Sequence, residues 1–400
     1  MSAGFPTLAT AATCAHVADQ FALAAMPLIL TAAGASPGLV SAVVAAQAAA
    51  WLVVSLPAGV LADRLSRRTI MLAGAALILA GAGLGWLATT DGRANAAMMA
   101  AAGFLCSAGV VLQVLSVFAL LPRLAAGHGI ARANATLEFC RACAALSAPF
   151  IAGLLVARGQ GAIAFLVALV AGAVSLIAVM SLPREPVQAV GTIALVASIR
   201  EGARFVWQQP ILKAIALCAI AWNSAFFALT AVIAPYAVSI VGASVEEVGR
   251  AWAVYGCGLL LGAAVAPAAL KTLPTGFLFV FGPASSLAGV LALALLAPRF
   301  GVPALYVGLF TLGFGPMLWL VLQTSVRQIL TPKDMLGRVA ATMTTAIYGV
   351  RPIGALAAGG VATAYGLEAA LWLAVALFAL SVVAILRSPT PGLSELPAGA

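Results

Sequence analysis

Residues 38–89 read GLVSAVVAAQAAAWLVVSLPAGVL, then ADRLSRR, then TIMLAGAALILAGAGLGWLAT. Two long apolar runs therefore enclose a short segment that is rich in charge. About 20 apolar residues in a helix cross the hydrocarbon layer of a membrane, and only helices or closed barrels satisfy the backbone there. Because the runs lack the strict alternation of barrel strands, they predict two transmembrane helices joined by a charged loop.

The composition extends this prediction to the whole chain of 400 residues. Hydrophobic residues make up 64% of it and charged residues 8%, whereas a soluble domain carries about 25% charged residues. We predict an all-α integral membrane protein with 12 transmembrane helices. The predicted spans are 8–31, 38–61, 69–89, 95–121, 134–156, 161–182, 211–240, 249–271, 275–297, 303–326, 338–363 and 366–386.

One long polar interruption, residues 183–210, separates two sets of six spans. We predict an N-terminal bundle at 1–182, a C-terminal bundle at 211–388 and a tail at 389–400. Within the interruption, Thr192 to Trp207 has apolar residues on one side of a helix and charged residues on another. This pattern suits a helix on the membrane surface, and an ordinary solvated linker helix is the alternative.

The two halves repeat a pattern at equivalent places. The loop before the fifth span reads LPRLAAGHGIARANATLEF, and the loop before the eleventh reads VRQILTPKDMLGRVAATM. Each is basic, and each precedes a helix with a Pro and closely following Gly residues. We therefore predict two pseudo-symmetric bundles, with a substrate cavity near the midplane.

The basic residues are distributed unevenly among the loops. Cytoplasmic loops of membrane proteins carry an excess of Lys and Arg, which predicts an inner (plasma) membrane protein with both termini in the cytoplasm. The formal net charge of +9 follows from these loops, so we expect no nucleic-acid partner. The richer side carries Arg64, Arg67, Arg68, Arg123, Arg132, Arg184, Arg200, Arg204, Lys213, Lys271, Arg327, Lys333, Arg338 and Arg387, and the other side Arg93, Arg158, Arg250 and Arg299.

The loop GVLADRLSRR resembles the cytoplasmic motif of the major facilitator superfamily, G-x-L-a-D-r-x-x-R-[RK]. Gly59, Asp63, Arg64, Arg67 and Arg68 stand at its expected positions. The resemblance implies the major facilitator fold, secondary transport by alternating access, and a gating role for these five residues. Negative charge at Asp63 would be favourable beside a helix N-terminus.

Two later segments, PRLAAGHGIARANA and TPKDMLGRV, resemble the branch that includes the enterobactin exporter and macrolide-efflux-like proteins. The chain departs from the superfamily's drug/proton antiporters in its fourth span. Those proteins often carry an Arg there, whereas this span contains Gln113 and no charge.

Ionisable residues inside spans cost about 2.5–3.5 kcal/mol at a helix centre on insertion scales and usually mark a pathway or a structural pair. Asp19 is placed near the middle of the first span, and His16 shares its helix face. The pair could bind and release a proton, or Asp19 could clamp a neighbouring helix.

Glu138 and Arg141, three residues apart in the fifth span, are candidates for coupling or for an internal ion pair. Arg351 is the deepest cation and precedes Pro352, which loosens the local helix. We expect Arg351 to bind an anion or to pair with an acid.

Neutral polar residues within the spans are candidate cavity contacts, although each could equally link or pack helices. These residues are Gln113, Trp222, Asn223, Tyr236 and Gln323. Gly256, Gly258 and Gly262 predict a close-packing face. Cys140 and Cys143 have no second ligand pair beside them, so we expect no metal and no cofactor.

The predicted function is export of a small amphipathic compound, drug-like or a siderophore, driven by a proton or another coupling ion. The expected partners are this substrate, the ion and the lipid bilayer, and the chain is expected to be a monomer. A lysolipid or lipid flippase and a small-solute importer are alternatives, since the same fold serves them. A non-transporting receptor and an enzyme are remote alternatives, because His16 and His128 form no metal-ligand pattern.

Overall fold

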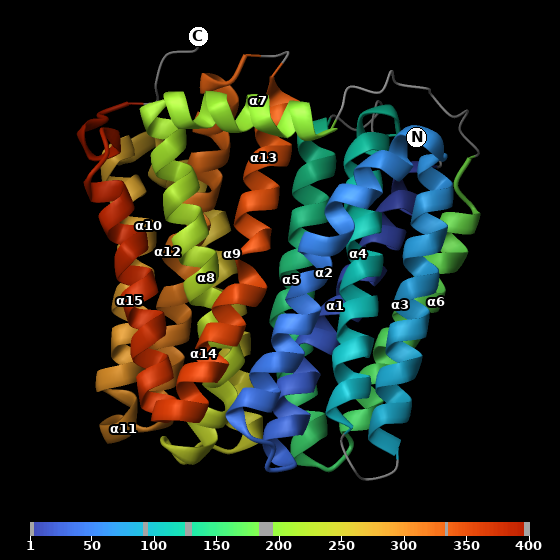
Figure 1. Cartoon of the computed structure of the whole chain (residues 1–400), viewed down its shortest axis with the longest axis vertical. Helices are drawn as coiled ribbons and strands as arrows, with labels where there is room; N and C mark the ends of the chain where they lie inside the picture. Colours follow the sequence, from blue (N-terminus) through green and yellow to red (C-terminus); the bar gives the residue numbers. More distant parts are fainter. Residues whose placement is uncertain (1–3, 91–94, 125–129, 184–194, 333–334, 396–400) are drawn as a thin grey trace. The chain divides into compact units, whose positions relative to one another are not determined.

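The computed structural model describes residues 4–90, 95–124, 130–183, 195–332 and 335–395, and every regular element among them is helical. Within the helices, the described set leaves out the side chains of residues 56–64, 118–119, 122–123, 130–132, 134–135, 195–199, 337 and 341. The chain forms two compact units, Met1–Thr192 and Ile193–Ala400. In each unit the long helices run side by side as a bundle (Figure 1).

The first unit contains six long helices around a core of small and aliphatic side chains. The helices are α1 (Gly4–Ala32), α2 (Pro37–Arg64), α3 (Arg67–Thr90), α4 (Ala96–Leu124), α5 (Ile130–Ala157) and α6 (Gly161–Met180). Leu8, Met71 and Leu120 lie in this core, which joins residues of the five helices α1, α3, α4, α5 and α6 and the residue Leu182.

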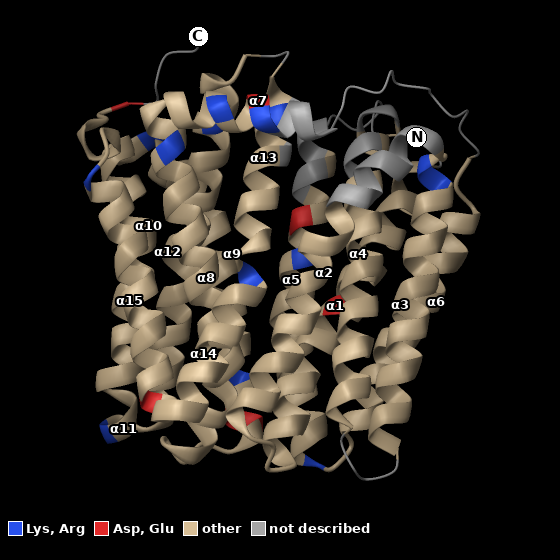
Figure 2. Ribbon diagram, in the orientation of Figure 1, with Lys and Arg blue, Asp and Glu red and all other residues tan. Residues whose placement is uncertain are grey.

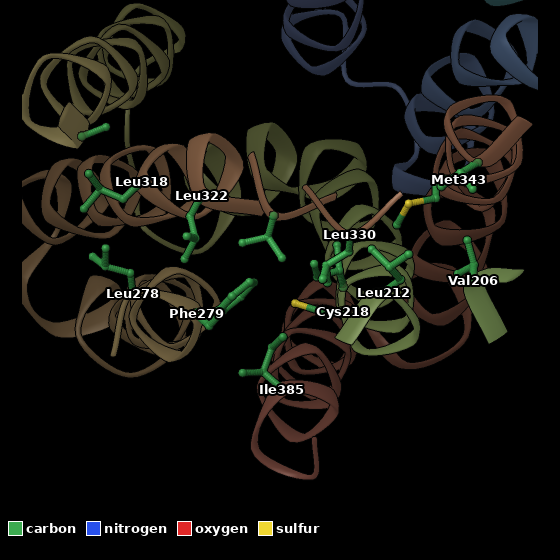
Figure 3. Packing of buried hydrophobic residues seen from close by; sticks show 14 of the residues in the cluster. Val206, Leu212, Cys218, Leu278, Phe279, Leu318, Leu322, Leu330, Met343 and Ile385 are labelled. Atoms are coloured by element: carbon green, nitrogen blue, oxygen red, sulfur yellow. The ribbon is translucent and has the colours of Figure 1, made fainter. Parts of the chain in front are cut away.

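The second unit has more helices because it includes an amphipathic helix, a short turn and an interrupted span. Figure 3 shows residues of a hydrophobic core cluster in this unit. The helices are α7 (Leu195–Gln208), α8 (Pro210–Ser239), α9 (Val245–Thr272), α10 (Thr275–Leu295), α11 (Ala297–Phe300), α12 (Val302–Leu330), α13 (Leu336–Gly349), α14 (Arg351–Tyr365) and α15 (Leu367–Leu386), followed by the 3-10 turn η1 (Thr390–Gly392).

Eleven of the described helices are long and apolar enough to cross a membrane. The span predicted at 338–363 is not one continuous helix, since α13 ends at Gly349 and α14 begins at Arg351. The cause is Pro352 in the first turn of α14. Proline has no backbone N–H, and its ring clashes with the carbonyl of the residue four positions earlier, so it begins a helix more readily than it continues one.

Glycines allow several pairs of helices to approach very closely, among them α3 with α4 in the first unit and α9 with α12 in the second. A Cβ added to Gly74 of α3 would lie 2.7 Å from the carbonyl oxygen of Gly109 on α4. In the second unit, a Cβ added to Gly258 of α9 would collide with the carbonyl oxygen of Phe310, and one at Gly262 would lie 2.6 Å from that of Phe314 on α12. The predicted close-packing face of α9 is confirmed at these two glycines.

The amphipathic helix α7 packs along α13. Val206 is buried in the core of the second unit (Figure 3), and Arg338 on α13 donates to Glu201 at 2.7 Å. A Cβ at Gly202 would lie 2.6 Å from the carbonyl oxygen of Arg338, so the two helix backbones nearly touch. Trp207, the residue that follows Val206, points away from this core and is 62% exposed. Helix α7 therefore presents one face to protein and the other away from it.

Candidate functional site

Asp19 lies in the interior of the first unit, on α1. Its side chain is 8% exposed, and the hydroxyl of Ser107 on α4 donates to its Oδ1 at 2.7 Å. Hydrogen bonds to a charged acceptor are shorter and stronger than those between neutral groups. The carboxylate is thus held at the contact between α1 and α4.

His16 lies one turn before Asp19 and is half-buried. It is close enough to α5 for the charges of Arg141 and Glu138 to act on it. The two residues of α1 therefore lie near different helices, His16 near α5 and Asp19 near α4.

Glu138 and Arg141 form the expected ion pair. The Nε and Nη2 atoms of Arg141 both donate to Oε2 of Glu138, at 2.8 Å and 2.6 Å. Both residues belong to α5 and lie three positions apart, and both side chains are substantially exposed. This contact therefore bridges one turn of a helix and does not clamp two helices together.

In the second unit, Arg351 stands at the first position of α14. Its Nε donates to Oδ1 of Asn223 on α8 at 3.0 Å. Its guanidinium carbon lies 3.9 Å from the ring centre of Tyr348 and 4.9 Å from that of Phe227. The amide nitrogen of Asn223 donates in turn to the carbonyl of Ala219 at 2.9 Å, which directs Oδ1 toward the arginine.

Aromatic rings continue from this arginine across α8 and α9. Trp222 stacks on Phe226 with ring centres 5.0 Å apart, and Tyr255 and Trp252 lie 5.7 Å and 6.1 Å from Phe226. We call Trp222, Phe226, Phe227, Trp252, Tyr255 and Tyr348 the aromatic cluster. Apart from Phe227, these rings are only partly buried, as is Arg351.

Five members of the aromatic cluster were not candidates from the sequence, which had pointed only to Trp222. A signal was present for two of them. Phe226 follows Trp222 by four residues, and Tyr348 precedes Arg351 by three, so each neighbour falls on the same helical face or one turn away. The residues of α9 gave no such signal, because their approach depends on how α8 and α9 pack.

Two of the other neutral candidates, Gln113 and Tyr236, link helices to one another. Gln113 donates to the carbonyl of Met71 and to Ser175, each at 3.2 Å, and Ser175 donates to the carbonyl of Ala11 at 2.9 Å. This network connects α1, α3, α4 and α6.

Tyr236 is fully buried and donates from its hydroxyl to the carbonyl of Leu293 at 3.0 Å, which links α8 to α10. Gln323 is buried on α12 and donates to its neighbour Thr324 at 3.0 Å. Trp222 also has a linking contact, because its Nε1 donates to Ser286 on α10 at 2.8 Å.

Gln47 is a buried polar residue that was not among the candidates from the sequence. Gln47 on α2 is 3% exposed, and neither atom of its amide has a hydrogen-bond partner within the described part of the chain. A Cβ added to Gly103 of α4 would lie 3.2 Å from the Cβ of Gln47. Gly103 is one turn before Ser107 on α4. Gln47 therefore packs against α4 near the serine that donates to Asp19. A glutamine midway along a predicted span was the available signal.

Of the charged loop motif, Gly59 and the side chains of Asp63 and Arg64 lie outside the described set. Arg68, at the start of α3, donates to the carbonyls of Val179 and Met180 at 3.2 Å and 2.6 Å. These carbonyls end α6, where a helix lacks internal donors and favours positive charge. Arg67 begins α3 and is half-buried.

Among the described residues, no three His, Cys, Asp or Glu side chains gather closely enough to hold a metal ion. Cys140 and Cys143 are both half-buried and both carry free thiols.

The sequence profile of the major facilitator superfamily matches residues 8–355, and the chain belongs to that superfamily. It is a membrane transporter by family and not an enzyme. Among curated proteins, it is 28% identical to the multidrug efflux pump Tap of Mycobacterium tuberculosis, over 98% of this chain and 93% of that protein. It is also 28% identical to the uncharacterized MFS-type transporter y4rN of Sinorhizobium fredii, over 96% of this chain and 95% of that protein.

Solved transporters share the fold at low identity. A POT family transporter in complex with 5-aminolevulinic acid superposes with a TM-score of 0.78 at 14% identity, covering 96% of each chain. The nucleoside transporter NupG gives 0.76 at 10% identity, covering 96% of this chain and 98% of the other. A D-xylose-proton symporter gives 0.70 at 14% identity, covering 97% and 98%.

Proposed function

We propose that this transporter exports small amphipathic compounds, drug-like molecules or siderophores, by alternating access coupled to an ion gradient. The observation that carries the proposal is the aromatic cluster around Arg351. Flat apolar faces and one oriented cation suit an organic molecule with a planar ring system and a polar end. The likeness to proteins named as multidrug efflux pumps supports the same direction of transport.

Asp19 is the proposed coupling residue, and His16 on α1 and the pair Glu138–Arg141 on α5 are further candidates for this role. A carboxylate at this depth is costly unless it is bonded or used. Ser107 supplies one hydrogen bond. A single proton can leave or join such a group as the environment of α1 changes between states.

The charged loop motif is the proposed gate on the cytoplasmic side, with Gly59, Asp63, Arg64, Arg67 and Arg68 as its members. The bonds from Arg68 to the end of α6 support this role, because they tie the start of α3 to another helix end. Within the second unit, Lys and Arg gather at the end that carries α7 (Figure 2), which supports a cytoplasmic location for that end. In this proposal the protein lies in an inner membrane, with both termini on the cytoplasmic side.

A susceptibility panel tests the export proposal. The gene would be expressed in a bacterial host that lacks its own efflux pumps, and growth would be measured against amphipathic drugs and against siderophore overload. We expect tolerance to rise for planar amphipathic compounds, together with lower cellular accumulation of those compounds. Higher accumulation in the expressing strain would instead indicate an importer. Movement of fluorescent lysolipid between leaflets of proteoliposomes, with no drug phenotype, would indicate a flippase.

A further inference from the structure

We propose that one face of α7 binds the head group of an anionic phospholipid, in the leaflet that meets this end of the second unit. The face consists of Arg200, Arg204 and Trp207, with Lys213 of α8 beside it, and we call it the basic face of α7. This inference goes beyond the proposed export, because it concerns a contact with lipid that can be measured without any transport.

The helical repeat brings the three residues of α7 onto one side. With 3.6 residues per turn, positions 200, 204 and 207 fall within about 60° of one another around the helix axis. All three side chains are exposed. Gly202 and Val206 fall on the opposite side of the helix, and both are buried. The basic face therefore points away from the protein interior that the other side covers.

The position of α7 directs this face toward lipid. Helix α7 runs crosswise to the long helices of its unit, at the end where α8 begins (Figure 1). Since α8 is long and apolar enough to cross a membrane, a helix crosswise to it lies along the membrane plane at the level of the head groups. A Cβ at Gly202 would meet Arg338 and Thr342, which are one turn apart on α13. Helix α7 thus covers the flank of α13, and its outer face points sideways from this unit.

The charge of the basic face is not neutralised by the protein. Glu201 is the single acid of α7, and it accepts from Arg338 at 2.7 Å. Neither Arg200 nor Arg204 has an ion pair within the described residues. A guanidinium donates two parallel hydrogen bonds to a phosphate group. Two exposed guanidinium groups one turn apart therefore suit a phosphate at the membrane surface.

Trp207 and Lys213 extend the face from the phosphate toward the acyl chains. The Nζ atom of Lys213 lies 4.3 Å from the centre of the Trp207 ring. Tryptophan is enriched at the boundary between membrane and water, because its ring is apolar and its N–H is polar. The ring and the cation therefore offer an apolar contact and a charge side by side.

This combination favours a phospholipid over a soluble anion. A free phosphate ion could bind the two arginines but would leave the Trp207 ring exposed to water. A phospholipid covers the ring and supplies the negative charge in one molecule, and an interfacial helix with basic residues gains affinity from both contributions.

Lipid binding would be measured by native mass spectrometry on the purified full-length protein in neutral detergent. Phosphatidylglycerol and phosphatidylcholine are the probes, and we expect the parent to bind phosphatidylglycerol more tightly. Arg200→Gln combined with Arg204→Gln should weaken binding of phosphatidylglycerol about ten-fold or more, because each basic residue near an anionic membrane surface contributes about five-fold. Binding of phosphatidylcholine should not change.

Lys271→Gln combined with Arg387→Gln is the matched control. It removes two exposed basic residues of the same unit and changes the net charge by the same amount, so it should bind phosphatidylglycerol like the parent. Equal weakening in this control would overturn the proposal, because the attraction would then depend on net charge alone. Parent-like binding in the double arginine variant would also overturn it. Both arginines are exposed, so the variant should keep the melting temperature of the parent.

Trp207→Phe tests whether the face meets lipid at all. The difference in emission between the parent and this variant reports the Trp207 ring, and in vesicles of phosphatidylglycerol and phosphatidylcholine it should be quenched by lipids brominated on the acyl chains. An unquenched difference would place the ring in water and overturn the proposal. Displacement of the lipid by an equal concentration of inorganic phosphate, or tighter binding of polyglutamate than of phosphatidylglycerol, would assign the face to a soluble anion and would overturn it as well.

Discussion

The two units hold charged residues of opposite sign within their helices. In the first unit, Asp19 is buried and accepts a hydrogen bond from Ser107. In the second, the partly buried Arg351 lies against two aromatic rings and donates to one amide. A buried acid suits exchange of a proton, whereas a stacked arginine suits contact with an organic molecule. The proposed function accordingly assigns coupling to the first unit and substrate contact to the second.

Replacing Asp19 is expected to have the largest effect. Asp19→Asn keeps the shape and a hydrogen-bonding group but removes the charge, so accumulation driven by a proton gradient should be abolished. Proteoliposome flux, with and without the gradient, and melting temperature would be measured on one preparation.

Ser107→Ala is the matched control for Asp19→Asn, since it removes the hydrogen bond and leaves the carboxylate. It should shift the pH dependence of transport without abolishing coupling. Full gradient-driven flux in Asp19→Asn would refute the division of roles and would turn attention to Glu138.

Replacing Asp63 should slow turnover. Removing the charge of a gate residue shifts the balance between inward-open and outward-open states, and a shift of about 1–2 kcal/mol changes that ratio about five-fold to thirty-fold. Turnover in proteoliposomes would be compared for Asp63→Asn and the parent. Parent-like turnover would exclude a latch at this position.

A pair of glycine variants tests whether the packing of α9 supports the aromatic cluster, because α9 carries both Trp252 and Tyr255. Gly258→Ala places a methyl group against the carbonyl of Phe310 and should destabilise the protein by about 1–3 kcal/mol, as overpacking does. Gly360→Ala meets open space and should be stabilising by up to about 1 kcal/mol, because alanine favours helix. Thermal unfolding in detergent would show opposite signs, and equal shifts would contradict the packing.

The smallest effect is expected at Gln47. Gln47→Leu removes a buried amide whose atoms have no partner in the described part of the chain, so stability should rise by about 1 kcal/mol, the lower end of the penalty for an unsatisfied buried group. The first unit would then tolerate an apolar residue beside α4. A fall in melting temperature would show that the amide is bonded, for example by a buried water.

Local features of the sequence predicted the helices and several contacts within them. Apolar runs predicted the spans, the spacing of Glu138 and Arg141 predicted an ion pair, and Gly258 and Gly262 predicted close packing. The sequence predicts that Pro352 loosens one continuous helix, whereas in the structure the proline divides the span at Val350.

Contacts between distant segments could not be predicted. Asn223 and Arg351 are 128 residues apart, and Asp19 and Ser107 are 88 apart. Each pair depends on the rotation of two packed helices about their axes, which no local pattern specifies. The same reason explains why Gln113 and Tyr236 could be identified as buried polar residues without their linking partners being known.

The crossing of α9 and α12 also limits how the sequence can drift. Gly258 and Gly313 each lie directly against a backbone carbonyl of the opposing helix. The contact is possible because glycine has no Cβ. A larger residue at either place cannot be accommodated by a smaller partner, because the partner is already a carbonyl group. Outward-facing positions such as Leu261 and Val307 can exchange freely among apolar residues. Apolar positions on the outside of α9 and α12 can therefore be substituted, whereas the glycines at the contact are needed for the short distance between the two helix axes.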